Sequence, residues 1–127
     1  MPPSLLIVDD HARFRQTARR ALERDGWTVA GEAADGAEAL RAARALAPDV
    51  VLLDAGLPGV SGLEVARRLH AGMPHIAVVV ISTHDSADYH DLAVANGARG
   101  FLPKAELTGA ALEAVLSGGV AGGAADR

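Results

Sequence analysis

The chain has 127 residues, which suits one compact domain; half of them are hydrophobic, 3% are aromatic, and the formal net charge is −4. An acidic chain with few aromatic residues and no cysteine lacks the usual means of binding nucleic acid, building a disulfide framework or holding a metal with thiolates. Because it shows neither a signal peptide nor a long apolar run, we expect a cytoplasmic protein that binds no membrane.

Five short apolar runs, which predict strands, alternate along the chain with five longer stretches that predict helices. The predicted strands are residues 4–8, 27–31, 49–54, 76–81 and 99–102. The predicted helices are residues 11–25, 35–47, 61–72, a stretch that ends near 96, and 106–117. Each connection contains a helix, so the strands should run parallel in an α/β sheet that is covered by helices on both faces. The strand order should reverse once and leave a crevice at the carboxyl ends of the strands.

Polar residues stand where four of the predicted strands stop. These residues are Asp9 and Asp10 after the first strand, Asp54 at the end of the third, Ser82 and Thr83 after the fourth, and Lys104 after the fifth. Because the carboxyl ends of parallel strands share one edge of a sheet, the groups should meet there.

The helix that follows Thr83 has the weakest apolar face, formed by Tyr89, Leu92 and Ala93, and is a candidate moving part.

The residue types at this edge favour phosphoryl chemistry. Carboxylates at one site repel one another, and a hard cation such as Mg²⁺ would remove that conflict. Asp54 is then a suitable nucleophile toward phosphorus, and the ammonium of Lys104 can offset the charge of the product. Simpler interpretations exist, since Asp9, Asp10 or Ser82 can cap a helix and Lys104 can be a surface lysine. Capping needs only one acid, however, and does not account for Asp54.

The five histidines show no spacing typical of a zinc site. His84 lies just past the two hydroxyl residues, from where it could reach a phosphoryl group. The chain also lacks the glycine-rich phosphate and dinucleotide motifs and the Gly-x-Ser-x-Gly motif of hydrolases.

Four separated segments give the chain its resemblance to the receiver domains of bacterial two-component response regulators. They are LLIVDDH at 5–11, Asp54 with LPG at 57–59 and SG at 61–62, IS at 81–82, and GARGFLPK at 97–104. Their order and spacing agree with the family over roughly residues 4–117. The last segment, which no proline follows, looks most like receivers that precede a LuxR-type helix-turn-helix output domain.

The resemblance implies a flavodoxin-like fold, with a five-stranded parallel sheet in the order 2-1-3-4-5 and five helices on both faces. It implies that Asp54 accepts a phosphoryl group from a sensor histidine kinase in the presence of Mg²⁺, or Mn²⁺ in its place. The metal ligands that it implies are Asp9, Asp10, Asp54 and the backbone carbonyl of Gly56. The chain is then not an enzyme, beyond self-catalysed phosphotransfer and dephosphorylation.

A conformational switch is also implied by the resemblance. Lys104 matches the phosphate-pairing lysine, Ser82 the switch hydroxyl and Phe101 the switch aromatic. Phosphorylation should change the face made by the fourth helix, fifth strand and fifth helix, favour a homodimer and control transcription. Thr83 and His84 are expected to lie at the access to the phosphoryl group, where Thr83 replaces the usual Ala or Gly.

Other interpretations stay open. The chain can be a stand-alone receiver that acts through protein contacts, a degenerate receiver that only binds proteins, or a small Mg²⁺-dependent phosphohydrolase. A phosphohydrolase would need an acid/base group and a substrate-binding cap, and the sequence has no insertion for a cap. We expect residues 1–117 to form the receiver domain and residues 118–127 to form a Gly/Ala-rich tail or linker. Contacts with DNA would come from a following output domain.

Overall fold

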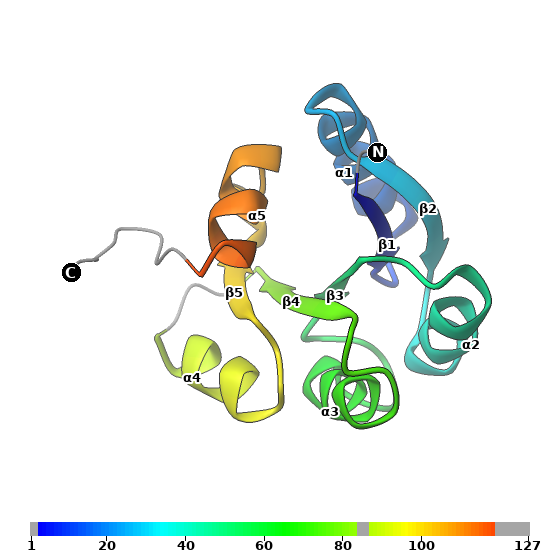
Figure 1. The fold of residues 1–127 in the computed structure, drawn as a ribbon, viewed down its shortest axis with the longest axis vertical. Helices are drawn as coiled ribbons and strands as arrows, with labels where there is room; N and C mark the ends of the chain where they lie inside the picture. Colours follow the sequence, from blue (N-terminus) through cyan, green and yellow to red (C-terminus); the bar gives the residue numbers. More distant parts are fainter. Residues whose placement is uncertain (1–2, 84–86, 119–127) are drawn as a thin grey trace.

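The structure, a computed structural model, describes residues 3–83 and 87–118, and within these ranges strands and helices alternate (Figure 1). The strands are β1 (Ser4–Val8), β2 (Thr28–Ala33), β3 (Val50–Asp54), β4 (Ala77–Ser82) and β5 (Gly100–Pro103). The helices are α1 (Ala12–Arg24), α2 (Gly36–Leu46), α3 (Gly62–Gly72), α4 (Ala87–Ala95) and α5 (Gly109–Leu116). A 3₁₀ turn, η1 (Lys104–Glu106), lies between β5 and α5.

The sheet is parallel and has the order β2-β1-β3-β4-β5, which confirms the predicted fold class. β1 and β3 lie inside the sheet, and their apolar runs are buried because helices cover both faces. From β1 the chain goes to the outer strand β2 and then returns to β3 on the other side of β1. The strand order therefore reverses between β1 and β3, the point where parallel sheets of this kind bind ligands.

Helices cover the two faces of the sheet unequally, with α1 and α5 on one face and α2, α3 and α4 on the other (Figure 1). Each face has its own buried core. Leu22 of α1 and Leu112 of α5 belong to one, and Ala43 of α2 and Leu69 of α3 belong to the other. None of the helices in the described ranges has the length and apolar character needed to cross a membrane.

The last helix begins later than the sequence predicts. The chain forms η1 at Lys104–Glu106, and α5 starts only at Gly109. Two side chains fix this start: Oγ1 of Thr108 accepts a hydrogen bond from the N–H of Ala111 at 3.0 Å, and Oδ2 of Asp25 accepts one from the N–H of Gly109 at 2.7 Å. The helix begins where both acceptors can satisfy its free amides.

Candidate functional site

The predicted site residues gather at the carboxyl edge of the sheet. Val8 pairs with Leu53, Asp54 with Ile81, and Ser82 with Pro103, so the four strands stop at nearly the same level. Asp9, Asp54 and Ser82 are buried there; they are the buried polar side chains of the described residues. Burial of two acids side by side is costly unless a positive charge accompanies them.

Lys104 supplies that positive charge. Its Nζ lies 2.5 Å from Oδ2 of Asp9 and 3.5 Å from Oδ1 of Asp54, and its side chain is only 11% exposed. The lysine belongs to η1, immediately after β5, and the turn directs it back across the ends of β4 and β3 toward β1. One ammonium therefore bridges acids that stand 45 positions apart in the sequence.

The environment of Asp54 disfavours its charged form. Burial raises the pKa of this carboxyl above its usual value of 3.8, and the neighbouring charge of Asp9 raises it further. The Lys104 ammonium and a hydrogen bond from the backbone N–H of Gly56 oppose the rise in pKa without cancelling it. The positive charge at the site therefore does not fully balance the negative charge of its carboxylates.

Asp9 shows where further positive charge fits. Its Oδ1 accepts a hydrogen bond from the backbone N–H of His11 at 2.8 Å. Its Oδ2 is buried and receives no hydrogen bond, although the Lys104 ammonium lies 2.5 Å away. A buried carboxylate oxygen without a hydrogen bond is a suitable ligand for a hard cation.

Asp10 and His11 complete the acidic loop after β1. The Asp10 carboxylate is one-third exposed, and its Oδ1 lies 3.3 Å from Nδ1 of His11, which is 3.2 Å from Oδ1 of Asp9. These three side chains could together hold a metal ion. The spacing between histidines does not reveal His11; the signal in the sequence is its position directly after two acids. Neither acid caps α1, whose N-cap residue is His11 and has no side-chain cap.

The loop after β3 lies against Asp54. Gly56 is exposed, and its N–H binds the Asp54 carboxylate, while the role of its carbonyl stays a prediction. Gly62, the first residue of α3, packs so closely that a Cβ there would collide with the backbone carbonyl of Asp54. Glycine at 62 thus lets α3 begin directly beneath the end of β3.

The residues predicted to form the switch, Ser82 and Phe101, lie in β4 and β5. Ser82 is the buried last residue of β4, whereas Thr83 is exposed. Phe101 of β5 is buried and stacks on Tyr89 of α4, with ring centroids 5.7 Å apart and an interplanar angle of 9°. The stack joins the fifth strand to the fourth helix. His84 lies outside the described residues.

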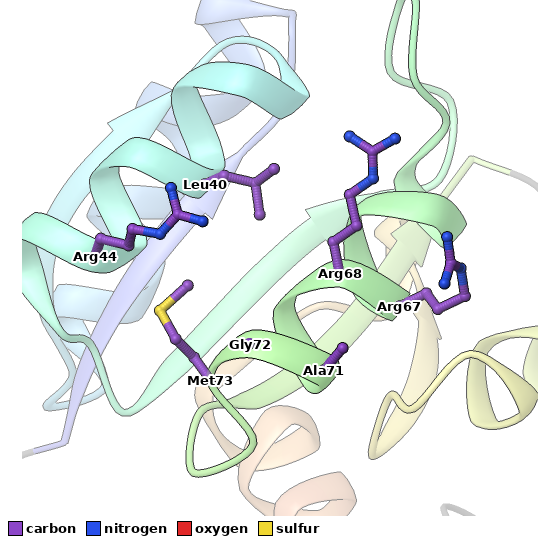
Figure 2. Close-up of a pocket in the computed structure, with 7 residues that line it drawn as sticks. All are labelled: Leu40, Arg44, Arg67, Arg68, Ala71, Gly72 and Met73. Carbon is purple, nitrogen blue, oxygen red and sulfur yellow. The ribbon is translucent and has the colours of Figure 1, made fainter.

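One of the cavities of the described residues lies away from this edge. It has a volume of about 390 Å³ and lies between the carboxyl ends of α2 and α3, which precede β3 and β4, so it is at the opposite end of the sheet from Asp54 (Figure 2). Arg44 extends toward Leu40 and Met73 at its wall, whereas the guanidinium groups of Arg67 and Arg68 point away from that of Arg44 (Figure 2). Both of these arginines pair with Glu64. The cavity contains none of the predicted site residues.

Comparison with known proteins gives one consistent answer. Residues 5–116 match the model of the response regulator receiver domain family. The response regulator GacA of Pseudomonas aeruginosa is 38% identical over 113 residues, which are 88% of this chain and 51% of that protein. The chain spans about half the length of the curated relatives it matches.

Solved structures agree with the sequence match. A LuxR-family two-component response regulator from Aurantimonas is 34% identical, with a TM-score of 0.85 and coverage of 93% of this chain and 87% of that one. A response regulator protein from Burkholderia pseudomallei, solved with a phosphorylated aspartic acid, a calcium ion and citrate, is 30% identical. Its TM-score is 0.79, and the similarity covers 90% of this chain and 66% of that one.

Proposed function

Because the chain belongs to the family of response regulator receiver domains, we propose that Asp54 is its phosphoacceptor and that a sensor histidine kinase is the phosphodonor. The observation that carries this proposal is the position of the Lys104 ammonium between Asp9 and Asp54 at the carboxyl edge of the sheet. The phosphorylated aspartic acid of the relative from Burkholderia pseudomallei supports the same chemistry.

The transfer needs few groups from the chain. An ionised carboxylate oxygen of Asp54 attacks phosphorus, a P–O bond forms, and the P–N bond to the kinase imidazole breaks as that nitrogen keeps the electron pair. No general base is required, because the attacking oxygen carries no proton. Lys104 lies close enough to Asp54 to pair with the carboxylate before the transfer and with the phosphoryl oxygens after it. Hydrolysis of the aspartyl phosphate later restores the acid.

A divalent cation fits the oxygen-rich site. We expect Asp9, Asp10, Asp54 and the backbone carbonyl of Gly56 to hold it, since hard cations prefer oxygen ligands and Oδ2 of Asp9 lacks a hydrogen bond. Mg²⁺, or Mn²⁺ in its place, would offset the negative charge of the carboxylates and of the incoming phosphoryl group. The raised pKa of Asp54 supports this proposal, because it indicates that the carboxylates lack sufficient positive charge beside them.

The output follows from a shift between two conformations. The Ser82 hydroxyl and Lys104 would bind the phosphoryl oxygens better in the active state, and Phe101 with its partner Tyr89 would carry the change to α4 and the α4–β5–α5 face. Moving the population from 1:99 to 99:1 requires about 5.5 kcal/mol of differential binding. Several charge-assisted hydrogen bonds to one phosphoryl group can supply this amount.

The consequence for the cell is transcriptional control from the cytoplasm, with homodimer formation on phosphorylation. The curated relatives are about twice as long as the matching region, which supports a receiver domain over residues 1–117 and a linker at 118–127 that leads to a DNA-binding output domain. A stand-alone receiver that acts through protein contacts is the alternative.

Thr83 and His84 would border the access to the phosphoryl group.

The test is phosphorylation by acetyl phosphate with Mg²⁺, followed by intact-protein mass spectrometry. The wild-type chain should gain one phosphoryl group, Asp54→Asn should gain none, and Asp91→Asn should behave as wild type because its carboxylate is 87% exposed and outside the site. Equal labelling of the Asp54→Asn variant would refute the assignment of the phosphoacceptor. Absence of labelling in the wild-type chain would refute the function itself.

A further inference from the structure

The ring of Phe14 lies against the Lys104 ammonium. Phe14 is in the first turn of α1, and Nζ of Lys104 stands over its ring, 4.4 Å from the centroid. This distance is well inside the range of about 6 Å in which a cation is attracted to the face of an aromatic ring. The ring is partly buried and packs against the core between the sheet and the α1 and α5 helices, so its own position is fixed.

Two carboxylates also contact the ammonium. Its Nζ lies 2.5 Å from Oδ2 of Asp9 and 3.5 Å from Oδ1 of Asp54, to which it donates a hydrogen bond. A lysine side chain is a compact charge on a flexible four-carbon chain, and charge attraction alone does not select one position between two carboxylates. The ring face adds a third contact, on a side of the ammonium that neither carboxylate occupies.

We propose that Phe14 is a positioning residue for phosphoryl transfer, because its ring holds the Lys104 ammonium beside both carboxylates. This inference rests on the proposed function of Asp54. An ammonium that is already in place loses less freedom when it pairs with the transferred phosphoryl group, which lowers the barrier. The attraction is electrostatic, so an aliphatic side chain of similar size cannot replace the ring.

Composition favours this role over simple core filling. The chain has four aromatic residues, and its core is otherwise built from aliphatic side chains. Two of the four, Phe101 and Tyr89, stack on each other across β5 and α4. Phe14 stands apart from that pair and places its ring on the lysine. A residue that only filled space at this position could be leucine or methionine.

The first experiment detects the contact itself by NMR. The ε-methylene protons of Lys104 should be shielded by the ring in wild type and in Phe14→Tyr, and should move to ordinary shifts in Phe14→Leu. Phe14→Met serves the same purpose if the leucine variant folds poorly, as judged by denaturant unfolding. Identical Lys104 shifts in wild type and in the aliphatic variant would overturn the proposal, because the ring then does not hold the ammonium.

The second experiment measures phosphorylation by acetyl phosphate with Mg²⁺. Phe14→Leu should slow the reaction about threefold to tenfold, as expected for the loss of one partly desolvated cation–π contact. Phe14→Tyr should restore the rate, and in a Lys104→Met background the leucine variant should cause no further loss. An equal loss in both backgrounds would show that Phe14 acts independently of the lysine and would overturn the proposal.

The two readouts separate this inference from the function on which it rests. If the wild-type chain is not phosphorylated while the Lys104 protons are shielded, the function of Asp54 fails and the ring contact stands without a role in transfer. If phosphorylation proceeds and the protons are not shielded, the positioning role of Phe14 fails and the proposed function is unaffected.

Discussion

At the scale of single residues, the charge of Asp54 opposes the stability of the fold. Burial and the neighbouring Asp9 raise the pKa of Asp54, so the folded protein binds a proton at this carboxyl more readily than the unfolded chain does. Stability must then fall as pH rises from the usual value of 3.8 through the raised pKa, because ionisation is harder in the folded state. A buried carboxylate that is costly to ionise is stabilised when a cation binds beside it.

We therefore expect Asp54→Asn to stabilise the metal-free protein at neutral pH by on the order of 1 kcal/mol, because it removes a partly compensated buried charge. The gain should shrink as pH falls through the raised pKa toward 3.8, where wild-type Asp54 becomes neutral as well. Urea unfolding across this pH range, with chelator present, measures the difference. A variant that is less stable than wild type at neutral pH would show that the charge of Asp54 does not oppose folding.

At the scale of elements, the positive-φ glycines that follow α1 and α4 face different surroundings. Gly97, after α4, has φ +90°, and a Cβ there would lie 2.6 Å from Cβ of His70 on α3. Gly26, after α1, has φ +95°, and a Cβ there would meet nothing within 4 Å. The first glycine is required by backbone conformation and by the packing of α4 on α3, the second by conformation alone.

Gly97→Ala should consequently destabilise the protein more than Gly26→Ala. Backbone strain should cost about 1–2 kcal/mol in each variant, and the collision with His70 should add about 1–3 kcal/mol to the first. Gly72→Ala is the control: a Cβ there meets nothing within 4 Å, and alanine at the end of α3 should be neutral or slightly stabilising. Denaturant unfolding of the three variants gives the order; equal losses at 97 and 26 would exclude a steric role for His70.

At the scale of the whole molecule, the site joins parts of the chain that meet only in the folded state. Asp9 and Asp10 follow β1, Asp54 ends β3 and Lys104 follows β5. A cation held by these acids binds the folded chain and has no comparable site in the unfolded chain. Its binding free energy should therefore appear as added stability of the entire domain.

Mg²⁺ should raise the free energy of unfolding by about 2.7 kcal/mol at a hundredfold excess over its dissociation constant. Asp9→Asn should remove most of this gain, because it removes a buried carboxylate of the site, whereas Asp91→Asn should keep it. Thermal unfolding with and without Mg²⁺, compared within each variant, corrects for differences in starting stability. A wild-type melting temperature that does not respond to Mg²⁺ would argue against a cation at these acids.

The sequence alone determined the fold class and the residues that gather at the sheet edge. Buried parallel strands must be apolar throughout, so the runs before Asp9 and Asp54 are unmistakable, and a helix in each connection requires the strands to be parallel. Since side chains that follow parallel strands share one edge, the meeting of Asp9, Asp54, Ser82 and Lys104 could be deduced without coordinates.

The tertiary structure alone decided which groups touch. The sequence did not reveal that Asp25 accepts a hydrogen bond from the N–H of Gly109, 84 positions later, at the start of α5. Nor did it reveal that the His11 ring contacts both Asp9 and Asp10, or that the Lys104 ammonium lies over the ring of Phe14. Contacts of this kind depend on the relative orientation of helices and turns. That orientation is set by packing across the whole domain, and local patterns in the sequence do not encode it.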